Sequence, residues 1–372
     1  SVKIDADPDE YCNAIITVKG LGGEIPNAGT KEKPLELFVG NAGTAARFLS
    51  AFVCLGKGVY RLHGIPRMHE RPQAALFQAL RELGYRIDSE NDKLPALIHG
   101  VGPLPGKCKV SIEESSQFAS ALLLCARAGK WQVKVVGENA EESPYVVLTS
   151  KLIETFQKMG RHFQIEPDAS SGSYFYAISQ FTFYRNPEKP GFGYDRPNVI
   201  VSNWPINSLQ IDANCVVYFN ELSSNPTSIS RMTDLGDSIM TAIVIAPFTL
   251  DSHKFTNLGR LRHQESERVE ALRTELTKCG AKVIETGDSL EVLPSELHGA
   301  EIETYNDHRM AMCFAILGLK VPGIKIKNPA CVKKTFPNFF QKLAAAPPAG
   351  LGATILDART GLPLAGEQLF AD

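Results

Sequence analysis

Apolar positions recur at helical spacing in three segments, each of which reaches a glycine and continues into a short run rich in apolar or β-branched residues. The glycine suits the left-handed backbone conformation that closes many helices. Each segment therefore predicts a helix followed by a strand. The segments are FQALRELGYRID around Gly84, LIETFQKMGRHFQIE around Gly160 and ALRTELTKCGAKVIE around Gly280. Their recurrence in both halves indicates repeated βα building blocks, although the irregular stretch from Gln180 to Ser230 breaks any strict period.

Small, polar or acidic residues precede an apolar helical run at five places. Each predicts a helix N-terminus capped by Asn, Ser or Asp, with a buried body. The runs are GNAGTAARFLSAFVC from Gly40, ESSQFASALLLCA from Glu114, PDASSGSYFYAIS from Pro167, GDSIMTAIVIA from Gly236 and NDHRMAMCFAILGL from Asn306. If these helix starts face one cleft, their free amides and dipoles form an anion-binding surface. The alternative is five ordinary capped helices in separate places.

Stretches rich in proline, glycine and asparagine indicate loops and boundaries. Residues 186–198 (NPEKPGFGYDRPN) and the run AAAPPAGLGA near the C-terminus are expected to lie on the surface. The tail that follows is expected to form a short hairpin around Arg359–Gly361. We place the main boundary near Glu166 and Pro167, which predicts domains over residues 1–166 and 167–345 and a tail over residues 346–372.

Composition narrows the function classes. The 372 residues suffice for two or three domains, and 44% hydrophobic with 22% charged residues is typical of a globular protein. The 39 basic and 41 acidic residues give a net charge of −2, so there is no polybasic surplus for a nucleic acid or an anionic membrane. The apolar runs are shorter than the ~20 residues that cross a bilayer. The start, SVKIDADPDE, lacks the pattern of a signal peptide.

The eight cysteines lie far apart, without a CxxC pair or metal-ligand spacing, as is typical of buried thiols in a reducing compartment. HExxH, GxSxG and Walker A motifs are also missing from the sequence. We therefore expect a cytosolic protein that acts on anionic small molecules by acid–base chemistry, with no metal and no cofactor.

Basic residues stand beside the predicted helix starts. Arginine binds phosphate and carboxylate through a bidentate fork, and lysine offers a compact charge, so these side chains suit phosphorylated or carboxylated ligands. Taken singly, the alternative for each is an ordinary surface charge or an ion-pair partner. They are Arg47, Arg67, Arg71, Arg268, His308, Arg309, Lys333 and Lys334.

Two carboxylates in the same segments are candidates for acid–base work: Asp237 in LGDSIMT and Glu265 in RHQESER, with His308 as an assistant. A carboxylate near clustered arginines normally has a depressed pKa, so a proton donor there needs compensating desolvation or substrate charge. For Asp237 the alternative is a helix cap. Gly43 in NAGT leaves room for a ligand to approach the amides of a helix start.

Seven motifs, in this order, resemble those of the 5-enolpyruvylshikimate-3-phosphate (EPSP) synthases: GNAGTAARFL, RMHERP, SSQFASALL, DASSGSYF, ESER, YNDHRMAM and CVKKTFPNFF. The match spans Ile15 to Leu343. The related transferase acting on UDP-N-acetylglucosamine shares the fold, but its reactive-cysteine loop has no evident counterpart here. The resemblance implies a two-domain inside-out α/β barrel of repeated βαβαββ units, with helices inside, sheets outside and helix N-termini facing the interdomain cleft.

The resemblance also implies a reaction: the enolpyruvyl group of phosphoenolpyruvate moves to the 5-hydroxyl of shikimate-3-phosphate, and phosphate leaves, in aromatic amino-acid biosynthesis. Asp237 would take the hydroxyl proton and Glu265 would protonate the methylene carbon. Arg71, Arg268, Arg309, Lys334 and the backbone at Gly43 would hold phosphoenolpyruvate. Thr44, Ser115, Ser116, Gln117 and Tyr145 would hold shikimate-3-phosphate, with Gln117 touching both. Asn41, Arg47 and Gln264 complete the expected binding set.

This chain departs from the family's pattern at Gln264, where Lys is usual, at Arg260, where Asn is usual, and at Glu142, where Ser is usual. The family's N-terminal segment with a Lys-Ser pair and a nearby Arg has no counterpart from Ser1 onward, and a chain that began there is expected to be nearly inactive. These departures motivate one alternative function, a non-catalytic phosphometabolite-binding relative. We further expect a monomer, in the cytoplasm or in a plastid, with no nucleic-acid or membrane partner.

Overall fold

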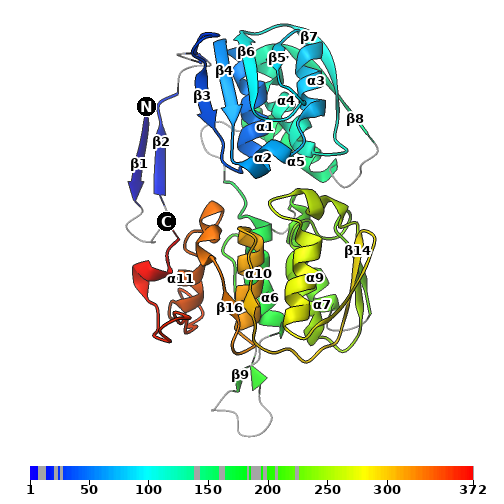
Figure 1. Ribbon diagram of the computed structural model, residues 1–372, viewed down its shortest axis with the longest axis vertical. Helices are drawn as coiled ribbons and strands as arrows, with labels where there is room; N and C mark the ends of the chain where they lie inside the picture. The colour runs from blue at the N-terminus through cyan, green and yellow to red at the C-terminus, as the bar shows by residue number, and fades with distance from the viewer. Residues whose placement is uncertain are drawn as a thin grey trace. The chain divides into compact units, whose positions relative to one another are not determined.

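The computed structural model describes residues 1–6, 14–20, 24–25, 28–137, 143–158, 164–181, 184–185, 194–195, 199–205, 208–222 and 226–371. They form two compact units, coloured along the chain in Figure 1. The N-unit comprises Ser1–Val2 and Val18–Ile165, and the C-unit comprises Lys3–Thr17 and Glu166–Asp372. Each unit has its own hydrophobic core. The two units are therefore described separately.

A four-stranded sheet of the N-unit has the order β3-β4-β6-β5, in which β3 pairs parallel to β4 and the other neighbours are antiparallel. Helix α1 connects β3 to β4, and α3 connects β4 to β5, so the chain order is β-α-β-α-β-β. The bounds are β3 (Leu35–Phe38), α1 (Gly43–Phe52), β4 (Lys57–His63), α2 (Pro66–Glu70), α3 (Ala74–Glu82), β5 (Arg86–Asp88) and β6 (Ala96–Val101).

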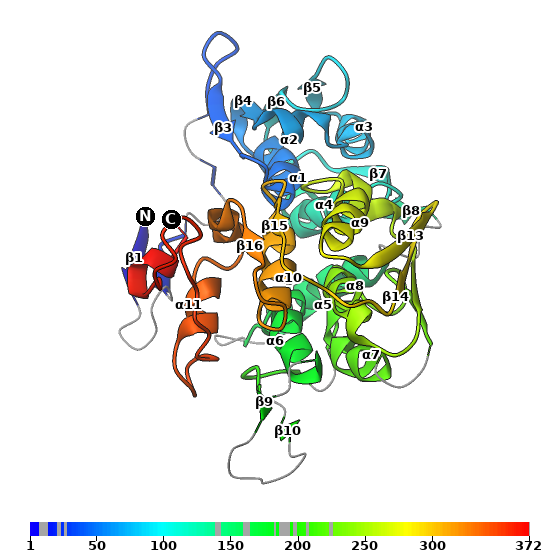
Figure 2. The ribbon, with the colours of Figure 1, turned by 60° about the horizontal axis from the view of Figure 1, so that its bottom comes forward.

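The C-unit repeats this arrangement. Its sheet has the order β11-β12-β14-β13, again with one parallel pair followed by two antiparallel ones. Figure 2 shows β13 and β14 side by side. The bounds are β11 (Ser228–Ser230), α8 (Ile239–Ile245), β12 (His253–Thr256), α9 (Arg268–Lys278), β13 (Lys282–Thr286) and β14 (Ser289–Leu293). The predicted βαβαββ unit is therefore present in both halves.

Each unit also contains a parallel strand pair with a helix between its strands. In the N-unit these are β7 (Gly106–Ser111), α4 (Ser116–Gly129) and β8 (Trp131–Val136). In the C-unit they are β15 (Glu301–Ile302), α10 (His308–Gly318) and β16 (Lys325–Ile326). The remaining helices and strands are β1 (Val2–Ala6), β2 (Ala14–Val18), α5 (Ser143–Lys158), α6 (Ala169–Phe181), β9 (Tyr184–Arg185), β10 (Tyr194–Asp195), α7 (Cys215–Glu221) and α11 (Phe339–Ala344).

Helices, rather than strands, form the centre of the C-unit. All seven residues of α8 are buried, and so are most residues of α10. In β13, by contrast, exposed and half-buried residues alternate. An apolar helix that is buried on every side belongs in the interior of its unit. The sheet then covers the helices from outside, as the prediction of an inside-out architecture requires.

The helix–glycine–strand prediction is confirmed at Gly84 and Gly280, each with φ +93° between a helix and a strand. It is wrong in part for the third segment: α5 forms, but residues 164–166 are not a strand, and Gly160 lies outside the described residues. Most of the predicted loop 186–198 also lies outside them, although Tyr194–Asp195 pairs with β9. The predicted tail hairpin is reduced to one antiparallel bridge, Leu356 to Pro363.

All five predicted helix starts begin a helix: α1, α4, α6, α8 and α10. Ser115 and Asp307 cap α4 and α10 by accepting backbone N–H bonds, and Asp168 accepts from Ser170 at the start of α6. The capping prediction is wrong for α1 and α8, whose capping residues Ala42 and Ser238 make no side-chain cap bond. Two of the five starts therefore lack the bond that a polar cap side chain supplies.

Candidate active site

Most predicted site residues lie in two clusters, one in each unit, and the cluster of the C-unit also contains two residues that were not predicted, Arg231 and Asp307. The N-cluster consists of Asn41, Gly43, Thr44, Arg47, Arg71, Ser115, Ser116 and Gln117. The C-cluster consists of Arg231, Asp237, Gln264, Glu265, Arg268, Asp307, Arg309 and Lys334. Both clusters are built around the helix starts described above.

Two buried guanidinium groups flank the start of α1. Arg47 donates to the carbonyl oxygen of Pro72 at 2.9 Å, and Arg71 donates to that of Asn41 at 3.0 Å. Their side chains lie against Gly43: a Cβ there would meet Arg47 and would lie 2.7 Å from Nη2 of Arg71. A side chain at position 43 would therefore have to displace the guanidinium groups of Arg47 and Arg71.

The start of α4 is linked to the start of α1 through Gln117. Its side-chain amide donates to the Thr44 hydroxyl at 3.1 Å, and its carbonyl oxygen accepts from Arg47 at 3.5 Å. The Ser115 hydroxyl, which caps α4, accepts from the backbone N–H of Gln117 at 3.2 Å. Ser116 is buried beside them. The predicted residues of the two helix starts thus form one hydrogen-bonded group.

Tyr145 lies on α5, which packs against α4. Its carbonyl oxygen accepts from Thr149 at 2.9 Å, and Thr149 shares a 2.7 Å hydrogen bond with Ser120 of α4. These bonds hold the first turn of α5 at α4. Glu142, one of the departures from the family's pattern, lies outside the described residues.

Asp237 is the centre of the C-cluster. Its Oδ1 accepts from Arg231 at 2.9 Å and from Gln264 at 3.5 Å. Its Oδ2 lies 3.2 Å from Nε of Arg309 and 3.5 Å from Nη1 of Arg268. Burial alone would raise the pKa of this carboxyl, but the charges of Arg309, Arg231 and Arg268 outweigh burial and hold the pKa far below its usual range. Asp237 is therefore ionised in the ligand-free site.

Arg268 links the two predicted acid–base carboxylates. It is fully buried and donates to Asp307 through Nε at 2.7 Å and Nη2 at 3.1 Å, a bidentate pair. Nη2 also donates to Glu265 at 2.8 Å, and Nη1 donates to Gln264. The other oxygen of Glu265 accepts from Lys334. Glu265 thus lies between two cations that the sequence assigns to phosphoenolpyruvate.

Arg309 follows the cap of α10 by two residues. Its guanidinium donates to the Ser170 hydroxyl at 2.9 Å and to the Tyr174 hydroxyl at 3.4 Å, both on α6. Its side chain is 14% exposed. The contacts with α6 fix the direction of the guanidinium and leave part of it open to solvent.

His308, the predicted assistant, is 4% exposed, and its Nδ1 has no hydrogen-bond partner among the described residues. Burial, with the charge of Arg309 next to it, lowers the pKa of His308 to about 3. The imidazole is therefore neutral at physiological pH. Any proton transfer by this ring uses the neutral form.

Sequence reasoning missed three residues of the C-cluster and its surroundings. Arg231 lies six positions before Asp237, and its spacing alone gives no signal. Asp307 was visible only as part of NDHR. Asp212 is buried and accepts from the Ser238 amide at 2.6 Å; burial and the charge of Asp237 raise its pKa. A buried carboxylate beside a helix start has no signature in a sequence read without its fold.

The clusters fit anions rather than cations. Among the described residues, no group of three or more His, Cys, Asp and Glu side chains is arranged to hold a metal ion. In the same part of the chain, no helix is long and apolar enough to span a membrane. What the clusters offer is a set of arginines with helix amides, a combination that binds phosphate and carboxylate.

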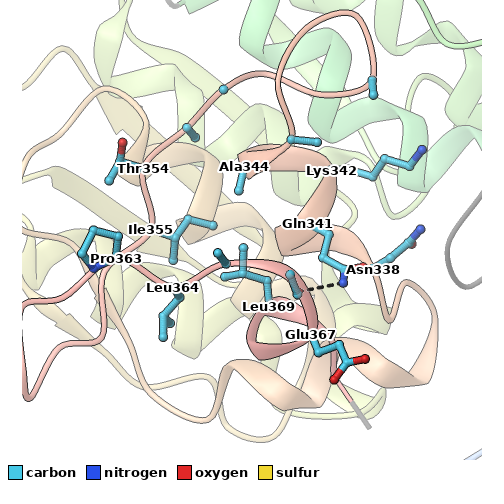
Figure 3. A pocket seen from close by; sticks show the side chains of 16 residues that line it. Asn338, Gln341, Lys342, Ala344, Thr354, Ile355, Pro363, Leu364, Glu367 and Leu369 are labelled. Atoms are coloured by element: carbon cyan, nitrogen blue, oxygen red, sulfur yellow. Dashed lines mark hydrogen bonds between the residues drawn. The ribbon is translucent and has the colours of Figure 1, made fainter.

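A cavity of about 850 Å³ lies elsewhere, between α11 and the C-terminal tail. Figure 3 shows Ile355, Leu364 and Leu369 lining it, with Gln341 bonded to the tail. Its lining includes no residue of either cluster. Its size therefore does not make it the site of the chemistry.

Comparison with known proteins identifies one family. The sequence model of the family EPSP synthase (3-phosphoshikimate 1-carboxyvinyltransferase) matches residues 3–343. A 3-phosphoshikimate 1-carboxyvinyltransferase of Trichormus variabilis is 35% identical over 370 residues, which cover 88% of this chain and 82% of the relative. The enzyme of that name from Vibrio cholerae is 35% identical over 366 residues, with the same coverage.

A solved structure of EPSP synthase from Acinetobacter baumannii aligns with 92% of this chain and 84% of its own, with a TM-score of 0.59 and 19% identity. A second structure of EPSP synthase from the same organism gives a TM-score of 0.55. These likenesses confirm the predicted fold, the two-domain inside-out α/β architecture.

Proposed function

The chain belongs to the EPSP synthase (3-phosphoshikimate 1-carboxyvinyltransferase) family, and from this premise we propose how its two clusters divide the work of the reaction. The enzyme transfers the enolpyruvyl group of phosphoenolpyruvate to shikimate-3-phosphate, in the shikimate pathway of aromatic amino-acid biosynthesis. The alternative of a non-catalytic binding relative is not favoured by these similarities.

We propose that the N-cluster binds anionic parts of both substrates. Arg71 and the amides at Gly43 would hold phosphoenolpyruvate, while Thr44, Ser115, Ser116, Gln117 and Tyr145 would hold shikimate-3-phosphate. The support is chemical: Arg47 and Arg71 donate to neutral carbonyl oxygens at 2.9 and 3.0 Å. A phosphate or carboxylate competes with such acceptors, because it brings a full opposite charge and can accept two parallel hydrogen bonds from one guanidinium group.

The C-cluster carries the acid–base chemistry. Asp237 takes the 5-hydroxyl proton, and Glu265 delivers a proton to the methylene carbon. The observation that carries this assignment is that Arg268 contacts both Asp237 and Glu265, at 3.5 and 2.8 Å. When phosphoenolpyruvate engages Arg268, Arg309 and Lys334, those cations are shared with a new anion. The pKa of Asp237 then rises towards its usual range, which makes the carboxylate a better base.

We also infer a monomer that acts on small molecules in a reducing compartment, the cytoplasm or a plastid, and binds no nucleic acid. The seven described cysteines are buried free thiols, which supports the compartment. Light scattering after size-exclusion chromatography tests the monomer, since a mass of two chains would contradict it.

The test of the assignment uses Asp237→Asn and Glu265→Gln in the full-length enzyme. We expect each to lower kcat by at least ~100-fold, the usual scale for a positioned acid or base, while calorimetry still shows shikimate-3-phosphate binding. The matched controls are Asp251→Asn and Glu270→Gln, which change exposed carboxylates of the same unit. Near-normal phosphate release by both site variants would remove these carboxylates from the mechanism.

A further inference from the structure

The segment that leads from β15 into α10 has an unusual backbone. Tyr305 and Asn306 are consecutive and are not glycines, yet both have left-handed φ, +52° and +53°. Such residues persist only where the surrounding structure holds them. The next residue, Asp307, caps α10 and pairs with Arg268, and Arg309 follows two positions later. What fixes this turn therefore fixes two cations of the C-cluster.

A fully buried carboxylate outside the C-cluster holds the turn. Glu275 of α9 accepts the Glu303 amide at 3.1 Å and the Tyr305 hydroxyl at 2.8 Å. Its charge is balanced by Lys278, whose Nζ lies 2.8 and 2.9 Å from the two oxygens. A buried charge with this many hydrogen bonds is costly to move, because it would lose its only compensation for leaving water.

Helix α9 contacts both ends of the segment from Glu303 to Asp307. Arg268 and Glu275 are seven positions apart and so lie on one face of the helix. Arg268 holds Asp307 at the end of the turn, and Glu275 holds Glu303 and Tyr305 at its start. Asn306, between them, accepts from Asn328 at 3.1 Å. Helices α9 and α10 pack against each other in the C-unit (Figure 1).

We propose that Glu275 is a positioning residue for phosphoenolpyruvate binding, which it supports by fixing the Glu303–Asn306 turn and hence the backbone at the start of α10, from which Arg309 extends. This inference rests on the proposed role of Arg309. Glu275 touches no substrate. Its effect reaches the reaction through the capping residue of α10, so it should change the affinity for the ligand that Arg309 holds more than the chemical step.

The primary variant is Tyr305→Phe, which removes one oxygen atom and leaves Glu275 and its lysine in place. We expect the KM for phosphoenolpyruvate to rise about tenfold, the scale of losing one hydrogen bond to a charged acceptor. The KM for shikimate-3-phosphate should stay unchanged. Glu275→Ala should have a larger effect on the same constant, and Glu275→Gln, which keeps an acceptor for the Glu303 amide, a smaller one than Glu275→Ala.

The matched control is Tyr218→Phe, which removes a phenol oxygen bonded to Asp234 elsewhere in the C-unit. It should leave both KM values unchanged. In the double variant Glu275→Ala with Tyr305→Phe, the KM for phosphoenolpyruvate should equal that of Glu275→Ala alone, because each change breaks the same contact, the hydrogen bond between Tyr305 and Glu275. Effects that multiply, or a loss of thermal stability with both KM values unchanged, would overturn the proposal.

Arg309→Ala distinguishes a failure of the positioning role of Glu275 from a failure of the proposed phosphoenolpyruvate site. If it raises the KM for phosphoenolpyruvate while Tyr305→Phe does not, the positioning role of Glu275 is wrong and the proposed site stands. If Arg309→Ala itself leaves that KM unchanged, the proposed site and this inference are both overturned.

Discussion

Arg231 offers the sharpest test of how the C-cluster controls its base. It donates to Asp237 at 2.9 Å, and its side chain is 4% exposed. Arg231→Gln removes this charge and keeps a side chain that can still donate a hydrogen bond. We expect the pKa of Asp237 to rise, because one of the three charges that outweigh its burial is gone.

The magnitude follows from the contact. Two unit charges about 4 Å apart interact by about 4 kcal/mol at an effective dielectric constant of about 20, which corresponds to roughly three pKa units. Arg309 and Arg268 remain at 3.2 and 3.5 Å and continue to favour the carboxylate. The expected rise in the pKa of Asp237 is therefore about 1 to 3 units, the range found for one close opposite charge.

The assay is the pH dependence of kcat at saturating concentrations of both substrates. This constant reports groups of the enzyme–substrate complex, in which the proposed mechanism has bound phosphoenolpyruvate bring the pKa of Asp237 back towards its usual range. Asp237 must be ionised to accept a proton, so the acidic limb of the profile should move to higher pH in Arg231→Gln. Arg231→Lys, which keeps the charge, should move it less, and Arg61→Gln, a change at an exposed ion pair of the N-unit, should not move it. Superimposable limbs for Arg231→Gln and wild type would refute the reasoning.

Two further changes test the geometry of each unit. Gly43→Ala places a methyl group against the guanidinium groups of Arg47 and Arg71. We expect the free energy of unfolding to fall by about 1–3 kcal/mol and the KM for phosphoenolpyruvate to be higher in the variant than in the wild type. Unchanged values of both would contradict the close approach. Asp307→Asn removes the charge of the bidentate partner of buried Arg268 and should destabilise the protein in urea unfolding. Because Glu265 and Asp237 still face the guanidinium, the loss should be smaller than the about 3–5 kcal/mol of a buried charge left without a partner. Burial opposes ionisation of Asp307 but Arg268 outweighs it and lowers the pKa, so this stabilisation is present above the unfolded pKa of about 3.9 and is lost as the pH falls through the folded pKa. Melting temperatures measured against pH should therefore fall more steeply in acid for wild type than for the variant, and parallel curves would contradict the assignment.

The sequence alone predicted the fold well where local rules and burial agree. Gly84 and Gly280 close helices with a φ that favours glycine, and the apolar runs after Ser115 and Asp307 form buried helices. The caps were less predictable, because the residue before α1 is Ala42 and its helix start is held by tertiary contacts of Arg47 and Arg71. A capping rule considers neighbours in sequence, and these neighbours are 25 and 30 positions away.

For the candidate site, residue types in motifs gave most of the members but not their partners. Asp237, Glu265 and Arg309 stand out because they belong to recognisable segments. Arg231 and Glu275 belong to no recognisable motif, because each acts through a contact that forms only in the folded chain. For Glu275 the contacting residues are 28 and 30 positions away. Such partners become visible only when the sheet and helices have brought distant segments together.

The arrangement around Asp237 resolves the conflict between its low pKa and its proposed role as a base. Arg268 and Arg309 are buried or nearly so, and unpaired they would be costly. Asp237, Glu265 and Asp307 neutralise them, which stabilises the folded site but makes Asp237 a weak base. In the proposed mechanism an anionic substrate takes over part of this neutralisation, so the arginines stay paired while the carboxylate loses some of its stabilisation. Binding and activation of the proposed base would then be one event, because the charge that attracts phosphoenolpyruvate is the same charge whose redistribution raises the pKa of Asp237 towards the value at which it can accept a proton.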